Sequence, residues 1–196
     1  MTEKPARPKR TFREMLDDRR GLLDADRYEA VVDRIARTLI AAFNAGKKVL
    51  WCGNGGSAAD AQHLAAEFSG RFLRDRRPLP SEAVSVNPSA VTAIANDFGY
   101  DVVFARQIEG HAQAGDVVVG ITTSGNSPSI VNALIAAKKC GATTIAFTGN
   151  GGGKVAEVAD INLIGPDGYA AIVQEVHITL GHIVCDLVEQ ALFPNA

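Results

Sequence analysis

Residues 49–68 read VLWCGNGGSAADAQHLAAEF, and this stretch decides the fold. The pattern predicts a buried strand, a glycine turn and a helix that starts at Ser57. Glycines before a helix N-terminus leave backbone N–H groups pointing at one spot, where the helix dipole favours negative charge. The same helix carries His63 and Glu67 four residues apart, on one face. The stretch therefore favours chemistry on a phosphorylated small molecule; the alternative is a tight turn followed by surface polar residues.

Strand and helix patterns alternate along the rest of the chain. Alternation of this kind predicts an α/β fold, a three-layer doubly wound sheet of about five parallel strands in the flavodoxin-like manner. We expect an N-terminal helical arm over residues 1–45, divided near Gly21 and Asp24, and one structural unit over residues 46–196. The expected strands are 48–52, 83–86, 116–121, 143–148 and 160–164. The expected helices after the arm are 57–72, 88–96, 101–112, 127–139, 154–158 and 169–192.

Composition limits the compartment and the partners. The 196 residues are 46% apolar and 21% charged, with a net charge of −2, which is ordinary for a globular protein and gives no sign of a nucleic-acid or membrane partner. We find no apolar run near the roughly 18 residues that a membrane span requires. Three scattered cysteines, without a Cys-x-x-Cys spacing, favour a reducing cytoplasm.

A second polar turn follows the third expected strand. Residues 122–127 read TTSGNS, so four hydroxyl groups gather before a helix, which suits phosphate binding. The alternative is simple N-capping, which needs only Ser127. The first turn also fits the dinucleotide pattern G-x-G-x-x-A, but the second strand ends in Val86-Asn87-Pro88 without the acidic residue that holds a ribose, so nucleotide binding is disfavoured.

Four motifs in order resemble one family. GNGGSAADAQHLAAEF, then Asn96-Asp97-Phe98-Gly99, then TTSGNS, then Gln174-Glu175-x-His177 with His182, resemble the sugar-isomerase (SIS) domain. Within that family the motifs are most similar to the phosphoheptose isomerases, which make heptose for the bacterial lipopolysaccharide core. The resemblance covers nearly the whole chain.

The resemblance implies an SIS-type fold, with residues 46–196 as the sugar-phosphate-binding domain, and a cytoplasmic isomerase. Such an enzyme interconverts sedoheptulose 7-phosphate and D-glycero-D-manno-heptose 7-phosphate through an enediol, as a homotetramer with active sites shared between subunits. It implies Glu67 and His182 as the general acid–base pair, and one zinc ion per subunit at His63, Glu67, Gln174 and His182. The substrate contacts that it implies are Asn54, Gly55, Gly56, Ser57, Glu67, Asn96, Asp97, Thr122, Thr123, Ser124, Ser127 and Gln174.

The chemistry of these residues agrees with an aldose–ketose isomerisation. A carboxylate can move a proton between adjacent carbons while an imidazole manages the oxygens, and a metal could polarise those oxygens. Gln174 and His182 are about 12 Å apart along a helix, so both reach one ion only if it lies between their tips. Gln is also an uncommon zinc ligand. We expect His177, five residues before His182, to make a structural or inter-subunit hydrogen bond. Arg71, one turn beyond Glu67, is expected to form a surface ion pair; the alternatives are a pair with Glu67 or a contact with the sugar.

The rival function is a non-catalytic SIS binding module, such as a DnaA-associating replication-initiation protein. Relatives of that kind lack the glutamate–histidine pair, whereas this chain has Glu67 and His182. A sugar-phosphate-sensing regulator would bring a DNA-binding segment, and the N-terminal arm shows no basic recognition helix. The sequence therefore favours an enzyme.

Overall fold

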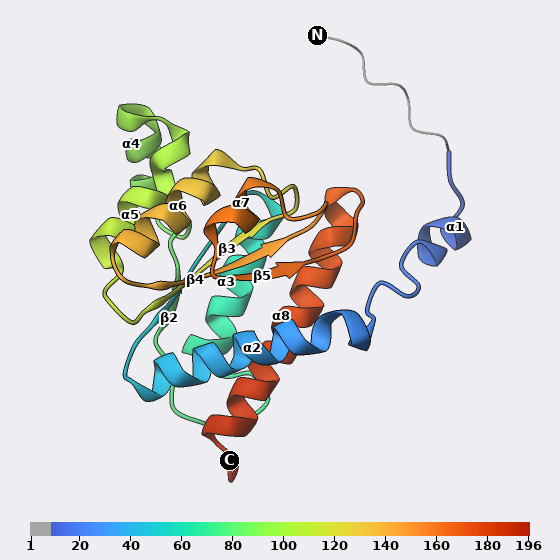
Figure 1. The fold of residues 1–196 in the computed structure, drawn as a ribbon, viewed down its shortest axis with the longest axis horizontal. Helices are drawn as coiled ribbons and strands as arrows, with labels where there is room; N and C mark the ends of the chain where they lie inside the picture. Colours follow the sequence, from blue (N-terminus) through green and yellow to red (C-terminus); the bar gives the residue numbers. More distant parts are fainter. Residues whose placement is uncertain (1–8) are drawn as a thin grey trace.

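The computed structural model describes residues 9–196 and shows an α/β fold built on one parallel sheet (Figure 1). The five strands lie in the order β2-β1-β3-β4-β5, the doubly wound order that the alternation predicted. The elements, in chain order, are α1 (Phe12–Asp17), α2 (Ala25–Asn44), β1 (Val49–Gly53), α3 (Gly56–Ser69), β2 (Ser81–Ala83), α4 (Pro88–Phe98), the 3-10 turn η1 (Tyr100–Val102), α5 (Val103–His111), β3 (Val117–Thr122), α6 (Pro128–Lys139), β4 (Thr143–Thr148), α7 (Gly153–Val158), β5 (Ile161–Ile164) and α8 (Ala170–Leu192).

Two apolar layers hold the sheet between its helices. One face is covered by α2, α3 and α8, with Trp51 and Phe147 at its centre. The other face is covered mainly by α5 and α6, around Phe104 and Ile130. The central strands β1 and β3 are buried along their whole length, which explains their unbroken apolar sequence.

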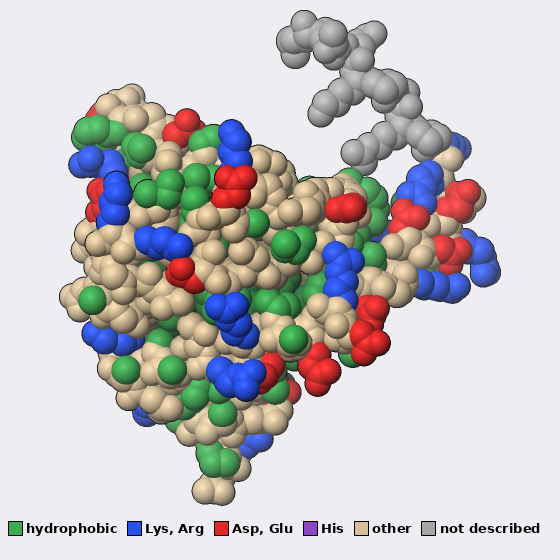
Figure 2. Space-filling view, viewed as in Figure 1, with side chains coloured by type: hydrophobic (Ala, Val, Ile, Leu, Met, Phe, Trp, Pro, Cys, Tyr) green, Lys and Arg blue, Asp and Glu red, His purple; other side chains and the backbone are tan. Residues whose placement is uncertain are grey.

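The N-terminal arm divides at Gly21 and Asp24, as predicted. Asp24 caps α2 by accepting a hydrogen bond from the Asp26 N–H. α2 then packs across α8 and joins the same core as the sheet, whereas α1 projects away from the body and carries no buried residue (Figure 1). On the face shown in Figure 2, acidic and basic side chains alternate without a patch of one sign. The first eight residues of the expected arm lie outside the described part of the chain.

The largest boundary errors are in two elements, while the other strands and the helices after the arm differ from the predictions by at most two residues at either end. The second strand is 81–83 rather than 83–86, because the Trp51 indole N–H donates to the Ser81 hydroxyl at 2.9 Å and fixes the pairing there. Residues 84–86 turn instead toward the cap of α4, where the Asn87 side chain accepts from the Ala90 N–H. The helix after β1, α3, ends at Ser69 rather than at residue 72, since the backbone that follows it bonds to Glu189 on α8.

Among residues 9–196, α8 is the helix that is long enough and, on average, apolar enough to cross a membrane, although polar residues interrupt its apolar runs, as expected. Half of the most apolar part of α8 is buried inside the fold, and the core helices of soluble proteins can have this length and composition. Buried His177 and Glu189 lie within this helix, so its apolar character is explained by packing on α2 and α3.

Candidate active site

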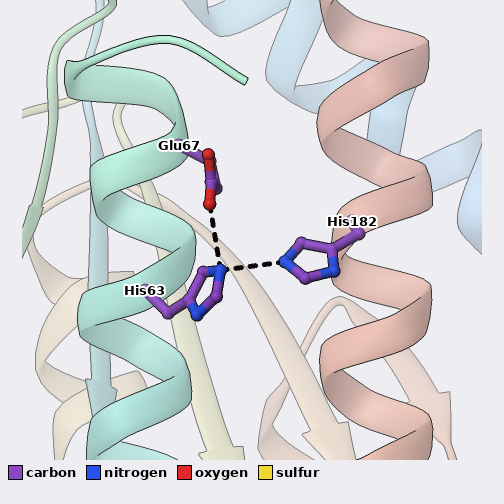
Figure 3. A group of neighbouring side chains, drawn as sticks. All are labelled: His63, Glu67 and His182. Carbon is purple, nitrogen blue, oxygen red and sulfur yellow. Dashed lines mark hydrogen bonds and ion pairs between the residues drawn. The ribbon is translucent and has the colours of Figure 1, made fainter. Parts of the chain in front are cut away.

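Three side chains from two helices converge at one point (Figure 3). His63 and Glu67 extend from α3, and His182 extends toward them from α8. The His63 Nε2 atom lies 2.9 Å from Glu67 Oε1 and 3.0 Å from His182 Nε2. The predicted acid–base pair and the predicted metal pair on α3 therefore form one cluster.

Small residues bring α3 and α8 together. A Cβ atom on Gly181 would lie 2.7 Å from the Leu64 side chain, and one on Gly56 would lie 2.5 Å from Gln174 Nε2. Both helices thus approach more closely than a side chain at these positions would allow. Gln174 lies against the first turn of α3, and His182 meets His63, all within one chain. These residues therefore need no second subunit to come together.

Burial shapes the proton chemistry of the cluster. Desolvation and the neighbouring His63 lower the pKa of His182, and Glu67 partly offsets them. His182 is therefore a neutral imidazole near pH 7, able to accept or donate a proton. The two ring nitrogens lie 3.0 Å apart, and a hydrogen bond between them needs one protonated and one unprotonated nitrogen.

The donor set of the cluster fits a divalent cation. The ligand atoms of His63, Glu67 and His182 lie within 4.8 Å of one another. Two imidazoles and a carboxylate form the three-ligand set of catalytic zinc sites, which keep a fourth position open. The Gln174 amide lies beside Gly56, seven residues before His63, so its role as a ligand stays a prediction.

The hydroxyl groups of the second turn cluster after β3. Thr122 Oγ1 lies 3.0 Å from Ser127 Oγ and 3.5 Å from Ser124 Oγ, and Thr123 follows Thr122 directly. Ser127 occupies the N-cap position of α6 but its side chain makes no capping bond. Simple N-capping therefore does not account for Ser127. Gly125 completes the turn with φ +66°, packed on the Gly152 carbonyl, where a Cβ would lie 2.0 Å from the oxygen.

The glycine turn lies beside this hydroxyl cluster. β1 and β3 are neighbours, and the strand order reverses between them, which is where ligands bind in such sheets. Gly55 has φ +56°, and no side chain caps α3. Asn54 joins the two turns: its Nδ2 donates to Ser129 Oγ at 3.0 Å, and its Oδ1 accepts from the Tyr100 hydroxyl at 2.7 Å.

The other predicted residues lie on α4, at the start of α3 and in the loop after α3. Asn96 donates to Asp97 Oδ1 at 2.8 Å on α4, and both are exposed. Ser57 is only 3% exposed at the start of α3. Arg71 is exposed and, within residues 9–196, forms no ion pair, so the expected surface pair is wrong.

The structural role predicted for His177 is confirmed. Its ring is fully buried, and Nε2 lies 2.8 Å from the Thr148 carbonyl oxygen of the same chain. Burial lowers the pKa of His177 to about 4, and the bond to Thr148 only partly offsets this effect. His177 is therefore neutral and remains separate from the cluster.

Sequence reasoning missed three neighbours of the site. Phe72 stacks on the His182 ring, with centroids 5.4 Å apart and planes at 20°. Tyr100 orients Asn54, as described above. Asp60 lies one turn before His63; burial raises its pKa to about 6, and its Oδ2 atom has no hydrogen-bond partner among the described residues. The spacing of three residues between Asp60 and His63 could have predicted that Asp60 lies near the site, because residues three apart share one side of a helix.

Comparison with known proteins supports the enzyme interpretation. The SIS domain family model matches residues 22–149. A phosphoheptose isomerase from Aquifex aeolicus is 47% identical over 93% of this chain and 94% of its own length, and one from Pelobacter propionicus is 53% identical over 81% and 84%. The solved structure of a phosphoheptose isomerase from Neisseria gonorrhoeae is 39% identical, with a TM-score of 0.78 over 91% of this chain and 92% of that one.

Proposed function

This chain belongs to the phosphoheptose isomerases of the SIS-domain family, and we propose that it interconverts sedoheptulose 7-phosphate and D-glycero-D-manno-heptose 7-phosphate. The observation that carries the proposal is the contact of His63 with both Glu67 and His182, at 2.9 and 3.0 Å. A binding module has no need of a carboxylate and two imidazoles at such distances. An aldose–ketose isomerase does need them, because it moves protons between carbon and oxygen.

Glu67 is the proposed base. Its Oε1 atom faces His63, which leaves the second carboxylate oxygen for the substrate. That oxygen takes the proton from carbon 1 of the open-chain ketose and returns it to carbon 2, through an enediol. His182, neutral near pH 7, assists ring opening and carries protons to and from the two substrate oxygens. His63 fixes the orientation of Glu67.

The hydroxyl turn holds the phosphate in this proposal. Thr122, Thr123, Ser124 and Ser127 offer hydroxyl groups beside the uncapped start of α6, where the helix dipole favours an anion. The glycine turn at Asn54, Gly55 and Gly56, with Ser57, Asn96, Asp97 and Gln174, contacts the sugar. The strand order reverses between these two turns, which supports their sharing one ligand.

A zinc ion is proposed at His63, Glu67 and His182, with Gln174 as the fourth ligand. When bound, zinc would polarise the carbonyl and hydroxyl oxygens at carbons 1 and 2 as a Lewis acid. The chain's own residues still bind and orient the sugar and move its protons.

The proposal also covers the oligomeric state, the cellular compartment and the pathway of the enzyme. We propose a cytoplasmic homotetramer that feeds heptose synthesis for lipopolysaccharide, with neighbouring subunits contributing to each site. The apolar side chains of Phe12, Met15 and Leu16 on α1 are exposed, and α4 buries no residue, as expected for segments that pack on another copy. The three cysteines are free, which is consistent with a reducing compartment.

One experiment tests the function. Purified protein is incubated with sedoheptulose 7-phosphate, with and without a chelator, and the products are separated as sugar phosphates. We expect an aldoheptose phosphate in the untreated sample, a lower rate with chelator, and at least a hundredfold lower rate for Glu67→Gln. No conversion in any sample would refute the enzyme. Near-normal turnover by Glu67→Gln would refute the role of Glu67, and an active monomer in sedimentation would refute shared sites.

A further inference from the structure

We propose that Glu189, Arg76 and Phe72 form a positioning unit that fixes the orientation of Glu67 and His182. None of the three touches the substrate in the proposed function. They act through the helix end that carries Glu67 and through the ring of His182. The inference rests on the acid–base roles proposed above.

Glu189 is a buried acid at the hydrogen-bonding centre of this unit. It lies on α8 two turns beyond His182, and its side chain is 0% exposed. Its Oε1 atom accepts from the Phe72 N–H at 2.9 Å, and its Oε2 atom accepts from the Leu73 and Arg74 N–H groups at 2.8 and 3.0 Å. Burial alone raises the pKa of Glu189, but these N–H groups and Arg76 hold it below its usual value. A charged carboxylate thus ties the loop after α3 to α8.

Arg76 joins the same carboxylate to the end of α3. Its side chain is 0% exposed, and Nε donates to Glu189 Oε1 at 2.8 Å. Nη2 donates to the Glu67 carbonyl at 2.6 Å, and Nη1 donates to the Phe68 and Gly70 carbonyls at 2.8 Å each. A helix end leaves such carbonyls without a partner inside the helix, and the Phe68 carbonyl also accepts from the Leu79 N–H. One guanidinium therefore connects the backbone of Glu67 to the helix that carries His182.

Phe72 connects Glu189 to the imidazole of His182. Glu189 holds the backbone of Phe72, and the Phe72 ring lies nearly parallel to that of His182, with centroids 5.4 Å apart. Parallel stacking restricts rotation of the imidazole about its side chain. The His182 Nε2 atom is then held at 3.0 Å from His63. The buried Glu189–Arg76 pair thus fixes both the position of Glu67 along α3 and the orientation of the His182 ring.

A purely structural role for Glu189 and Arg76 would give a different experimental result. If Glu189 and Arg76 only stabilise the fold, their removal lowers the melting temperature but leaves the folded site unchanged. If they position the site, a folded variant shows a displaced imidazole and a lower kcat at nearly unchanged KM, because the phosphate turn lies on other elements. A misplacement of about 1 Å costs on the order of 10²-fold in rate.

The test compares variants of the full chain by NMR and kinetics. Glu189→Gln places an amide NH₂ against N–H donors, so the loop must shift; Asp75→Asn makes the same chemical change at an exposed position of that loop. Phe72→Leu removes the ring, and Phe72→Tyr keeps it. Stacking by Phe72 is followed through the ¹H chemical shift of the His182 ring, which is assigned by its loss in His182→Gln. The spectra are recorded at about pH 8.5 without substrate, before and after addition of a chelator. If Glu189→Gln does not fold, Arg76→Lys takes its place.

We expect the His182 resonance to move downfield in Glu189→Gln and Phe72→Leu, with kcat about 10- to 100-fold lower and KM within about twofold. Phe72→Tyr and Asp75→Asn should match the wild type in both readouts. A wild-type His182 resonance in a folded Glu189→Gln or Arg76→Lys chain would overturn the inference, as would unchanged kcat in Phe72→Leu. An inactive wild type with displaced resonances in these variants would refute the proposed function alone.

Discussion

Replacing His177 by Gln should make the protein less sensitive to acid. The imidazole is fully buried, and burial lowers its pKa from 6.5 to about 4. The unfolded chain takes up a proton near pH 6.5, whereas the folded chain does so only near pH 4. Protons therefore favour the unfolded state, and the free energy of unfolding falls as the pH drops through this window.

The size of the effect follows from the two pKa values. Each pKa unit corresponds to about 1.4 kcal/mol. At about pH 5 most unfolded chains carry the proton and few folded chains do, so this one group lowers the free energy of unfolding by about 2 kcal/mol relative to pH 7.5. Below pH 4 the loss reaches about 3 kcal/mol.

Urea unfolding at about pH 7.5 and about pH 5, at one protein concentration, measures this difference. The glutamine amide in His177→Gln would still donate a hydrogen bond to the Thr148 carbonyl but would not titrate. The loss of unfolding free energy between the two pH values should therefore be about 2 kcal/mol smaller in this variant than in the wild type. His111→Gln, at an exposed position, should behave as the wild type. Equal losses in His177→Gln and the wild type would refute the reasoning.

Three further substitutions test other parts of the structure. Asp60→Asn should raise the melting temperature at pH 8 but hardly at pH 4, because burial raises the pKa of Asp60 to about 6 and penalises the charged form only at higher pH; an equal gain at both pH values in a thermal scan would contradict this. Gly125→Ala should lower the free energy of unfolding by at least about 2 kcal/mol in urea, since a Cβ at φ +66° would meet the Gly152 carbonyl; wild-type stability would exclude that contact. Thr122→Val, which removes a hydroxyl bonded to Ser127, should raise KM for sedoheptulose 7-phosphate by about tenfold or more with a smaller effect on kcat, and an unchanged KM would remove Thr122 from the phosphate site.

Hydrophobic patterning was sufficient to predict the fold. Runs such as residues 117–122, apolar at nearly every position, occur where a strand is covered on both faces, and the strand at 143–148 was predicted residue for residue. The pattern failed at the sheet edge, where β2 has three residues and one indole–hydroxyl bond fixes its register. An apolar run at residues 83–86 looks like a strand whether it pairs or turns, so local sequence could not decide.

The site was predictable only where its residues share an element. His63 and Glu67 follow from helical spacing, and the hydroxyl turn follows from its composition. His182 came from family resemblance, since no spacing rule relates it to residues 119 positions earlier. Phe72, Arg76 and Glu189 escaped notice for the same reason: their bonds join segments more than 110 residues apart. An acid among the apolar residues of the last turns of α8 was the available signal for Glu189, because buried acids need partners.

The separation of the two halves of the site constrains how one chain can hold a sugar phosphate. His63 follows Gly56 by seven residues, so the acid–base cluster lies about 10 Å along α3 from the glycine turn. The hydroxyl turn lies at the same end as the glycine turn, since Asn54 bonds to Ser129 at the start of α6. A phosphate at one end and reacting carbons at the other then require an extended ligand. The ring form of a heptose phosphate is compact, whereas its open chain is long and is also the form in which carbons 1 and 2 can exchange a proton. Both the geometry and the chemistry of the proposed mechanism thus favour the open chain as the reacting form of the substrate.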